Sequence, residues 1–464
     1  MDATGLIDAL QDKSMSSVEL VTDTLARIDA LNPVLNAIVG MRPVDDILAE
    51  AKAADATPPK GPLHGVPFAI KDLTETKDIR TTYGSPIFAD NIPDADSLMV
   101  QRIRDAGAII IGKTNTPEFG LGSHSYNPVY GVTRNPYDTS VSAGGSSGGA
   151  AVALATGMLP LADGSDMMGS LRNPAAWNNV YGFRPSYGLV PDDPAGENFL
   201  HQLSTSGPMA RSIRDLVLLL QVMAVPDARL PHGVPQFAPL ADATTLKGVT
   251  IGWVGDWGGY YPMDPEILHL CEVALDQMRD LGATVKPFTP PIAPEQLWHS
   301  WTTLRSWAIA AKQAPLYNDP KTRDLLKPEM IWEIERGLAM SAVEVHEASV
   351  IRSNWFTAFA GQPDVDVMAL PSAQIFPFNA ELHWPKTVMS RDMDTYHRWM
   401  EVVVPASLTG LPALNVPAGF GAAVLPMGMQ LVGQRGADAR ILQIGQLYHD
   451  ATDWPRRRPP EINA

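Results

Sequence analysis

Residues 144–185 read GGSSGGAAVALATGMLPLADGSDMMGSLRNPAAWNNVYGFRP, and this stretch is the most informative part of the sequence. It contains two glycine-rich turns that each carry a serine, and Ser146 and Ser170 lie 24 positions apart. Upstream, Lys71 follows the apolar run 66–70, where a charged lysine is costly to bury. Two serines on turns and a desolvated lysine are suited to act as nucleophile, proton relay and base.

The composition excludes several classes of protein. With 464 residues, of which 45% are hydrophobic, the chain can bury a large core. Its net charge of −16 argues against nucleic acid as a partner. A lone cysteine, Cys271, excludes an internal disulfide framework. Residues 1–11 lack the features of a signal peptide, and no apolar stretch is long enough to span a bilayer, so we expect a cytoplasmic protein without a membrane partner.

Helical and strand patterns alternate along the whole chain. Strand patterns occupy 108–111, 249–254, 366–370, 413–416 and 428–432, and helical patterns occupy 18–31, 97–106, 267–281, 295–361 and 438–452. A capping box at Ser16 and Glu19 opens the first of these helices, which we expect to end at Asn32-Pro33. The alternation favours an α/β fold with one large mixed β-sheet, helices on both of its faces and a helical excursion in the C-terminal half.

The sequence supports neither of two kinds of ligand site, a phosphate-binding loop or a zinc site. Residues 107–114 match the phosphate-loop expression G-x-x-x-x-G-K-T, but the middle positions are one alanine and three isoleucines, which favour a strand over a loop around phosphate. The ten histidines are never closer than fourteen positions, so no zinc-binding spacing is present. We therefore expect no nucleotide, no metal and no other cofactor.

The serine turn at 144–148 also matches the nucleophile elbow G-x-S-x-G of Ser-His-Asp esterases. An elbow follows a buried strand, whereas residues 135–143 are mostly turn formers. No later histidine lies in a local motif that would identify it as the catalytic partner of Ser146. These two observations count against an α/β-hydrolase esterase, but the motif match keeps it as a second alternative.

Several further motifs occur in a fixed order along the chain. They are HGVPFAIKD at 64–72, TNTPEFG at 114–120, GGSSGG at 144–149, DMMGSLRNP at 166–174, STSGPMAR at 204–211, LTGLPALNVP at 408–417 and GMQLVG at 428–433. Together they resemble the amidase signature family of serine hydrolases. The resemblance implies a single amidase domain over 1–464, with a catalytic core at 60–220. It also implies that Ser170 is the nucleophile, Ser146 the bridging serine on a cis peptide bond, and Lys71 the base.

The chemistry of this triad can be argued from the residues. Neutralising a free lysine at pH 7 costs roughly 4–5 kcal/mol, and burial beside the run 66–70 lowers that cost. Ser146 would then carry the proton between Ser170 and Lys71 and return it to the leaving amine. A structural lysine paired with Asp72 is the alternative interpretation.

The turn around Ser170 is suited to bind a tetrahedral oxyanion with backbone N–H groups. The resemblance assigns this oxyanion hole to Met167, Met168, Gly169 and Ser170. It makes Asp166 and Arg172 a pair that keeps the turn rigid, with Ser147 as a further supporting residue.

Met168 departs from the family's common pattern D-x-G-G-S, in which the first glycine stands at this position. If that glycine takes a positive φ, Met168 must accept strain or shift the turn. The side chain would either narrow the substrate pocket or pack into the core.

The substrate is indicated only in outline. Seven of the eleven tryptophans lie between Trp298 and Trp399, most of them expected in helix core and some at a hydrophobic entrance. The segment 290–365 is a candidate cover for that entrance. We expect an amidase for neutral hydrophobic or aryl amides and carbamates, with urethanase and esterase side activities. The alternative is the amidase component of a multi-subunit amidotransferase. The sequence leaves the oligomeric state open.

Overall fold

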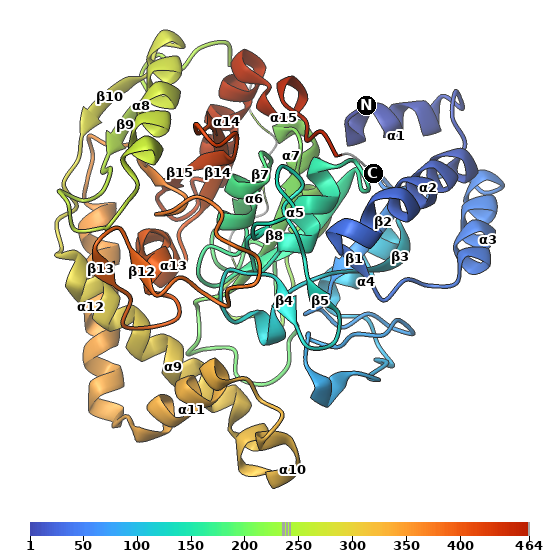
Figure 1. The fold of residues 1–464 in the computed structure, drawn as a ribbon. Coiled ribbons are helices and arrows are strands. Elements are labelled where there is room, and N and C mark those ends of the chain that lie inside the picture. The colour runs from blue at the N-terminus through green and yellow to red at the C-terminus, as the bar shows by residue number, and fades with distance from the viewer. Residues whose placement is uncertain (234–236, 238–239, 241–242, 463–464) are drawn as a thin grey trace.

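The large sheet of the predicted α/β fold is present and mixed. The computed structural model describes residues 1–233, 237, 240 and 243–462, and its eight-stranded sheet has the order β10-β9-β11-β15-β14-β7-β8-β6 (Figure 1). The strands are β6 (Leu161–Asp166), β7 (Tyr181–Arg184), β8 (Thr205–Ala210), β9 (Thr250–Trp253), β10 (Thr284–Pro287), β11 (Val367–Pro371), β14 (Ala413–Phe420) and β15 (Pro426–Gly433). Strand β9 runs parallel to β10 and β11, while the other pairs are antiparallel.

A second, three-stranded sheet carries Lys71. Its order is β1 (Ile38–Val39), β3 (Ile109–Thr114) and β2 (Pro67–Lys71), so β2 is an edge strand. Residues 109–111, in the middle of the phosphate-loop match, lie within β3, which excludes a loop around phosphate. Two short ribbons complete the strands: β4 (Tyr126–Asn127) with β5 (Gly131–Val132), and β12 (Thr387–Val388) with β13 (Arg391–Asp392).

Helices cover both faces of the large sheet, as predicted. Leu414 and Asn415 are neighbours on β14, so their side chains point to opposite faces. Gly445 of α14 (Asp438–Thr452) packs against Leu414. Gly428 lies on the side of Asn415 and faces Ala176 of α6 (Asn173–Trp177).

The remaining helices of the main body are α1 (Ala3–Gln11), α2 (Ser17–Leu35), α3 (Val44–Asp55), α4 (Leu98–Asp105), α5 (Gly148–Ala155), α7 (Ile213–Met223), α8 (Pro265–Asp280), α13 (Val404–Leu408) and α15 (Trp454–Arg457). Three 3-10 turns are added at Pro86–Phe88, Glu118–Gly120 and Arg398–Val403. Cys271 lies on the buried face of α8, as its spacing predicted.

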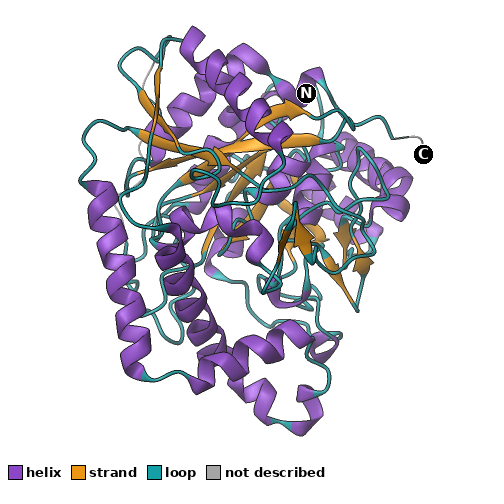
Figure 2. Ribbon diagram, turned by 60° about the vertical axis from the view of Figure 1, so that its left-hand side comes forward, coloured by secondary structure: helices purple, strands orange, loops and turns teal. Residues whose placement is uncertain are grey.

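Four consecutive helices project from the sheet in the C-terminal half. They are α9 (Pro294–Asn318), α10 (Pro320–Arg323), α11 (Pro328–Ala339) and α12 (Ala342–Ala360). All except the single-turn α10 are long, and Figure 2 shows the group beside the strands. Among the helices that the structure describes, none is both long and apolar enough to cross a membrane.

The first long helix shows how local signals set its ends. At its start Ser16 Oγ accepts from the Glu19 N–H at 3.1 Å, and the Glu19 carboxylate accepts from the Ser16 N–H at 2.8 Å, so the predicted capping box is present. The helix continues to Leu35, past the predicted end at Pro33. A proline in the last turn removes one N–H donor only, and Asn36, with φ +51°, closes that turn.

Candidate active site

Lys71 ends the edge strand β2 with its side chain fully buried. Its Nζ lies 2.8 Å from Ser146 Oγ and 2.8 Å from Ser147 Oγ. Ser165 adds its hydroxyl at 3.0 Å and its carbonyl oxygen at 3.3 Å. All four oxygens are neutral, so the amine is hydrogen-bonded without an ion pair.

Burial is the main influence on the protonation of this amine. It lowers the pKa of Lys71 to about 7, although the carboxylates of Asp163 and Asp166 pull the pKa upward. Near neutral pH the uncharged form of Lys71, which can accept a proton, is therefore populated. The carboxylate of Asp72, the alternative partner, accepts instead from the N–H of Thr82 at 3.0 Å.

The first serine turn lies between the two sheets. Its Gly145–Ser146 peptide bond is cis, and the Gly145 carbonyl accepts from Ser123 Oγ at 2.6 Å. The next residue, Ser147, donates its N–H to the Ser170 carbonyl at 3.3 Å. The two serine turns, 24 positions apart in sequence, are thus hydrogen-bonded to each other.

Ser170 lies on the turn that follows β6 and is 6% exposed. Within the described residues its hydroxyl makes no hydrogen bond, so it is free to face a substrate. Gly169 has φ +81°, and a Cβ there would lie 2.4 Å from Asn173 Oδ1. Only glycine fits this position, which holds Ser170 at the tip of the turn.

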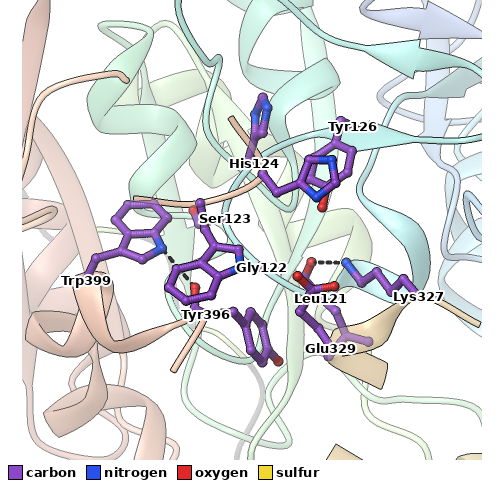
Figure 3. Close-up of a pocket in the computed structure, with 11 residues that line it drawn as sticks. Leu121, Gly122, Ser123, His124, Tyr126, Lys327, Glu329, Tyr396 and Trp399 are labelled. Atoms are coloured by element: carbon purple, nitrogen blue, oxygen red, sulfur yellow. Dashed lines mark hydrogen bonds between the residues drawn. The ribbon is translucent and has the colours of Figure 1, made fainter. Parts of the chain in front are cut away.

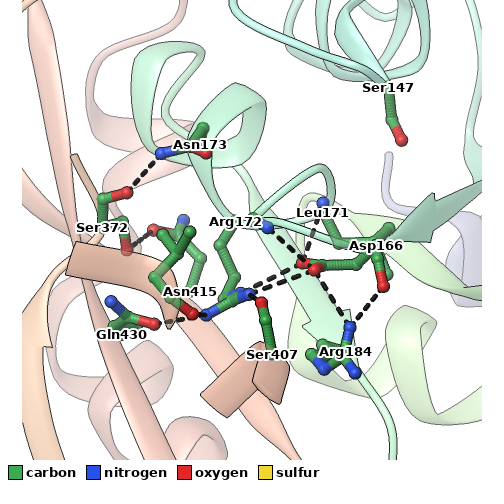
Figure 4. Close-up of polar contacts among 12 residues, drawn as sticks. Ser147, Asp166, Leu171, Arg172, Asn173, Arg184, Ser372, Ser407, Asn415 and Gln430 are labelled. Carbon is green, nitrogen blue, oxygen red and sulfur yellow. Dashed lines mark hydrogen bonds and ion pairs between the residues drawn. The ribbon is translucent and has the colours of Figure 1, made fainter. Parts of the chain in front are cut away.

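The Asp166 carboxylate holds this turn from inside the protein (Figure 4). It accepts from the N–H groups of Gly169 at 2.9 Å and Leu171 at 3.2 Å. Arg172 binds both of its oxygens at 3.0 Å, and Arg184 binds one at 3.1 Å. Although burial pulls the pKa of Asp166 upward, the two arginines hold it well below its usual range, so this carboxylate stays charged.

Arg172 also links the turn to β15 and to the segment 403–407. One N–H group donates to the Val403 carbonyl at 3.1 Å. Others donate to Gln430 Oε1 at 2.6 Å and Ser407 Oγ at 2.7 Å (Figure 4). All acceptors of the Arg172 guanidinium are buried, and these bonds restrict the movement of its side chain. The predicted pairing of Asp166 with Arg172 is present in the structure, and Arg184 is a second arginine that the motif did not indicate.

The amides of the turn are not equivalent as oxyanion donors. The Gly169 N–H is engaged by Asp166. In the part of the chain that the structure describes, the N–H groups of Met167, Met168 and Ser170 make no hydrogen bond to protein, so three of the four assigned donors are free. The oxyanion hole itself remains a prediction.

Met168 packs into the core of the protein. Its side chain is 3% exposed and belongs to the main hydrophobic cluster, and its φ is not positive. The left-handed position of the turn falls on Gly169 instead. The backbone strain considered for Met168 is therefore absent.

A small pocket lies beside the serine turns (Figure 3). It is lined by Leu121, Gly122, Ser123, His124, Tyr126, Lys327, Glu329, His383, Trp384, Tyr396 and Trp399. Ser123 joins it to the catalytic turn through the hydrogen bond to the Gly145 carbonyl. Most of its walls are aromatic, and Trp384 and Trp399 belong to the tryptophan-rich part of the sequence.

Histidine has no place in this arrangement. The pocket residue His124 donates from Nε2 to the Ala380 carbonyl at 2.9 Å, so its Nδ1 accepts from Ser142 Oγ at 2.7 Å. Both ring nitrogens are thereby occupied, and no histidine ring among the described residues is hydrogen-bonded to Ser146 or Ser170. The Ser-His-Asp interpretation has no support in the structure. Nor do three described His, Cys, Asp or Glu side chains form a group able to hold a metal ion.

Two residues of β6 contact the lysine and were missed from the sequence. Asp163 accepts the backbone N–H of Lys71 at 3.0 Å, and Ser165 contacts Nζ. Their positions alternate along the strand, so both side chains point to the face that meets β2. Polar residues at every second position of a buried strand were the signal that could have identified them.

Comparisons with known proteins agree with this geometry. The family model for amidases matches residues 19–442. The acylamidase of Rhodococcus erythropolis is 32% identical, over 99% of this chain and 97% of that protein. A glutamyl-tRNA(Gln) amidotransferase subunit of Picosynechococcus sp. is 33% identical, over 96% of this chain and 97% of that one. A solved bacterial aryl acylamidase of the amidase signature family has a TM-score of 0.90 at 27% identity, with 99% of each chain covered. The chain therefore belongs to the amidase family and is an amide-hydrolysing enzyme.

Proposed function

We propose that the chain cleaves the C–N bond of neutral hydrophobic or aryl amides and carbamates through an acyl-enzyme on Ser170. The observation that carries this proposal is the buried amine of Lys71, 2.8 Å from both Ser146 Oγ and Ser147 Oγ. An amine in contact with neutral hydroxyls, with a pKa lowered to about 7, can take a proton from serine.

The reaction begins with proton transfer along the triad. Neutral Lys71 accepts the proton of the Ser146 hydroxyl, Ser146 takes the proton of Ser170, and the Ser170 Oγ attacks the carbonyl carbon of the substrate. The free N–H groups of Met167, Met168 and Ser170 stabilise the oxyanion that forms.

The tetrahedral intermediate then collapses. The C–N bond breaks, the proton returns through Ser146 to the leaving amine, and the acyl group remains on Ser170 as an ester. Water attacks this ester with the same relay as base, and the acid is released with Ser170 restored. Carbamates and activated esters can follow the same route, which accounts for the proposed urethanase and esterase activities.

The substrate class is supported by the pocket of Figure 3. Aromatic walls favour flat apolar groups, and the pocket adjoins the turn that carries Ser146. Lys327 and Glu329 contribute one charge of each sign, so the pocket has no excess charge that would select an ionic substrate. We propose that the segment 290–365 covers this entrance, since these two pocket residues lie at the start of α11.

The second candidate is the amidase component of an amidotransferase that takes ammonia from an amide. The 33% identity to a glutamyl-tRNA(Gln) amidotransferase subunit favours it. Turnover of anilides, primary amides, aryl carbamates and L-glutamine by the purified chain alone distinguishes the two. Selective release of ammonia from L-glutamine would favour the amidotransferase component, and anilide cleavage without a partner would favour the hydrolase.

The nucleophile is tested by labelling with a fluorophosphonate, which loses fluoride and phosphonylates an activated serine. Trypsin leaves both serine turns on one peptide, because neither Lys nor Arg occurs between Arg134 and Arg172. Cleavage on the amino side of aspartate separates them into 138–162 and 166–191. We expect the adduct on 166–191, and an adduct on 138–162 would overturn the assignment of Ser170.

A further inference from the structure

We propose that Arg305, on α9, is a positioning residue that holds the oxyanion turn through the sulfur of Met167. The inference rests on the proposed function, in which the Met167 N–H binds the oxyanion. Arg305 lies 138 positions from Met167 and outside every motif of the sequence.

The contact is direct and partly buried. Arg305 Nη1 lies 3.0 Å from Met167 Sδ, and the arginine side chain is only 4% exposed. Helix α9 therefore contacts Met167, which lies between Asp166 and the rest of the turn. Within the described residues, the Met167 N–H has no protein partner, so the side chain supplies the polar anchor of this residue.

The guanidinium is fixed on its other sides. Its Nε donates to Glu333 Oε1 at 2.8 Å, and its Nη2 donates to the Tyr396 hydroxyl at 2.8 Å. The Tyr396 hydroxyl in turn donates to the same Glu333 oxygen at 2.8 Å. These three bonds close a triangle, which sets the direction in which Nη1 points.

Stability alone does not account for this arginine. A buried ion pair loses the hydration of both charges, and apolar side chains of similar volume often stabilise a fold as well. The charge of Arg305 is balanced by Glu333, yet one N–H is directed at a thioether, a weak acceptor. The result of this geometry is a contact from Arg305 Nη1 to Met167, in the turn that carries Ser170.

The network also reaches the pocket. Tyr396 lines the pocket in Figure 3, and its hydroxyl is bonded to Arg305. A group bound against Tyr396 would therefore act on the residue that positions Met167. We expect the contact to influence kcat more than KM, because its effect falls on the donors of the oxyanion.

The test is a double-mutant cycle on kcat with a neutral anilide. Met167→Leu removes the sulfur at similar volume, and Arg305→Lys keeps the charge beside Glu333 but loses Nη1. We expect each single change to lower kcat by about three- to tenfold with KM within about twofold, as for loss of one hydrogen bond. The double variant should be no slower than the slower single variant.

Matched controls separate this from general damage. Met223→Leu makes the same exchange in the buried face of α7. Arg102→Lys changes an arginine of α4 that donates to the Met223 carbonyl at 2.9 Å and, within the described residues, makes no hydrogen bond or ion pair with Glu333. Both should leave kcat within about twofold. If the single effects multiply in the double variant, or if Met167→Leu retains full kcat, the inference is wrong.

Failure of the proposed function gives a different result. In that case the unaltered protein leaves Ser170 unlabelled by fluorophosphonate and does not turn over the anilide. A labelled, active protein with an additive cycle overturns the role of Arg305 alone.

Discussion

Lys71 and Asp163 meet through the backbone of the lysine. The Lys71 N–H donates to Asp163 Oδ1 at 3.0 Å, while Nζ extends to the serine hydroxyls. The other oxygen, Asp163 Oδ2, is buried without a hydrogen-bond partner in the described structure. Burial raises the pKa of Asp163 to about 6, although the N–H of Lys71 and the charge of Lys113 oppose this rise. One carboxyl group therefore both closes the edge of β2 and influences the charge of the base.

The activity should depend on pH through Lys71. Its pKa lies near 7, so protonation below pH 7 removes the base and kcat/KM should fall by about tenfold per pH unit. Above pH 7 the lysine is neutral, and the profile should level off. Measuring kcat/KM for a neutral anilide between pH 5 and 9 checks this, and a profile that falls with rising pH would contradict a lysine base.

Replacing Asp163 by asparagine should move the acidic limb of that profile to lower pH. The carboxylate raises the pKa of Lys71, so its removal lets burial lower that pKa further. The amide oxygen of asparagine still accepts the Lys71 N–H, which preserves the edge of β2. The same measurement on Asp163→Asn and the unaltered protein gives the shift, and a limb that stays in place would show that Asp163 does not influence the base.

Two buried lysines on neighbouring strands offer a matched comparison. Lys71→Ala should lower kcat by about 10²–10⁴-fold because it removes the base, whereas its loss of stability should be no larger than that of Lys113→Ala. The Lys113 amine donates to the Thr74 carbonyl at 2.6 Å, Thr76 Oγ1 at 2.8 Å and Thr81 Oγ1 at 3.1 Å. Lys113→Ala leaves these acceptors without a donor and should lower the free energy of unfolding by about 2–4 kcal/mol.

Urea unfolding and kcat of both variants separate the roles. A Lys71→Ala protein with more than about a tenth of the original kcat would exclude Lys71 as the base.

Met168→Gly should lower the stability of the protein without changing its substrate selectivity. The buried side chain lies in the main core, so its removal should lower the free energy of unfolding by about 3–5 kcal/mol, including the added flexibility of glycine. The ratio of kcat/KM for a long-acyl and a short-acyl anilide should stay unchanged. A gain on the long substrate would show that Met168 narrows the pocket after all.

Local patterns in the sequence accounted for the five longest helices and for five of the strands that the structure describes. The helix predicted at 438–452 has those bounds, and the capping box of Ser16 and Glu19 is formed. The division into two sheets could not be read from periodicity, because a strand pattern does not say which distant strand is its partner. The alternation of patterns indicated one large mixed sheet, whereas Lys71 ends a strand of a second, smaller sheet.

Those parts of the candidate site whose residues are close in sequence could be predicted from motifs. The pair of Asp166 and Arg172 lies within six positions, and the lysine was marked by the apolar run before it. Arg184 and Arg305 were missed because their contacts with the turn depend on how strands and helices pack. The catalytic roles of Ser146 and Ser170 remain predictions.

The separation of β2 from the large sheet has a consequence for how activity can be lost. The amine of Lys71 comes from one sheet, Ser165 from the edge of the other, and Ser146 from the loop between them. Neither sheet alone supplies all of these groups. On the proposed mechanism, turnover should therefore depend on how the two sheets pack together, and conditions that separate them should abolish activity before the strands within each sheet come apart.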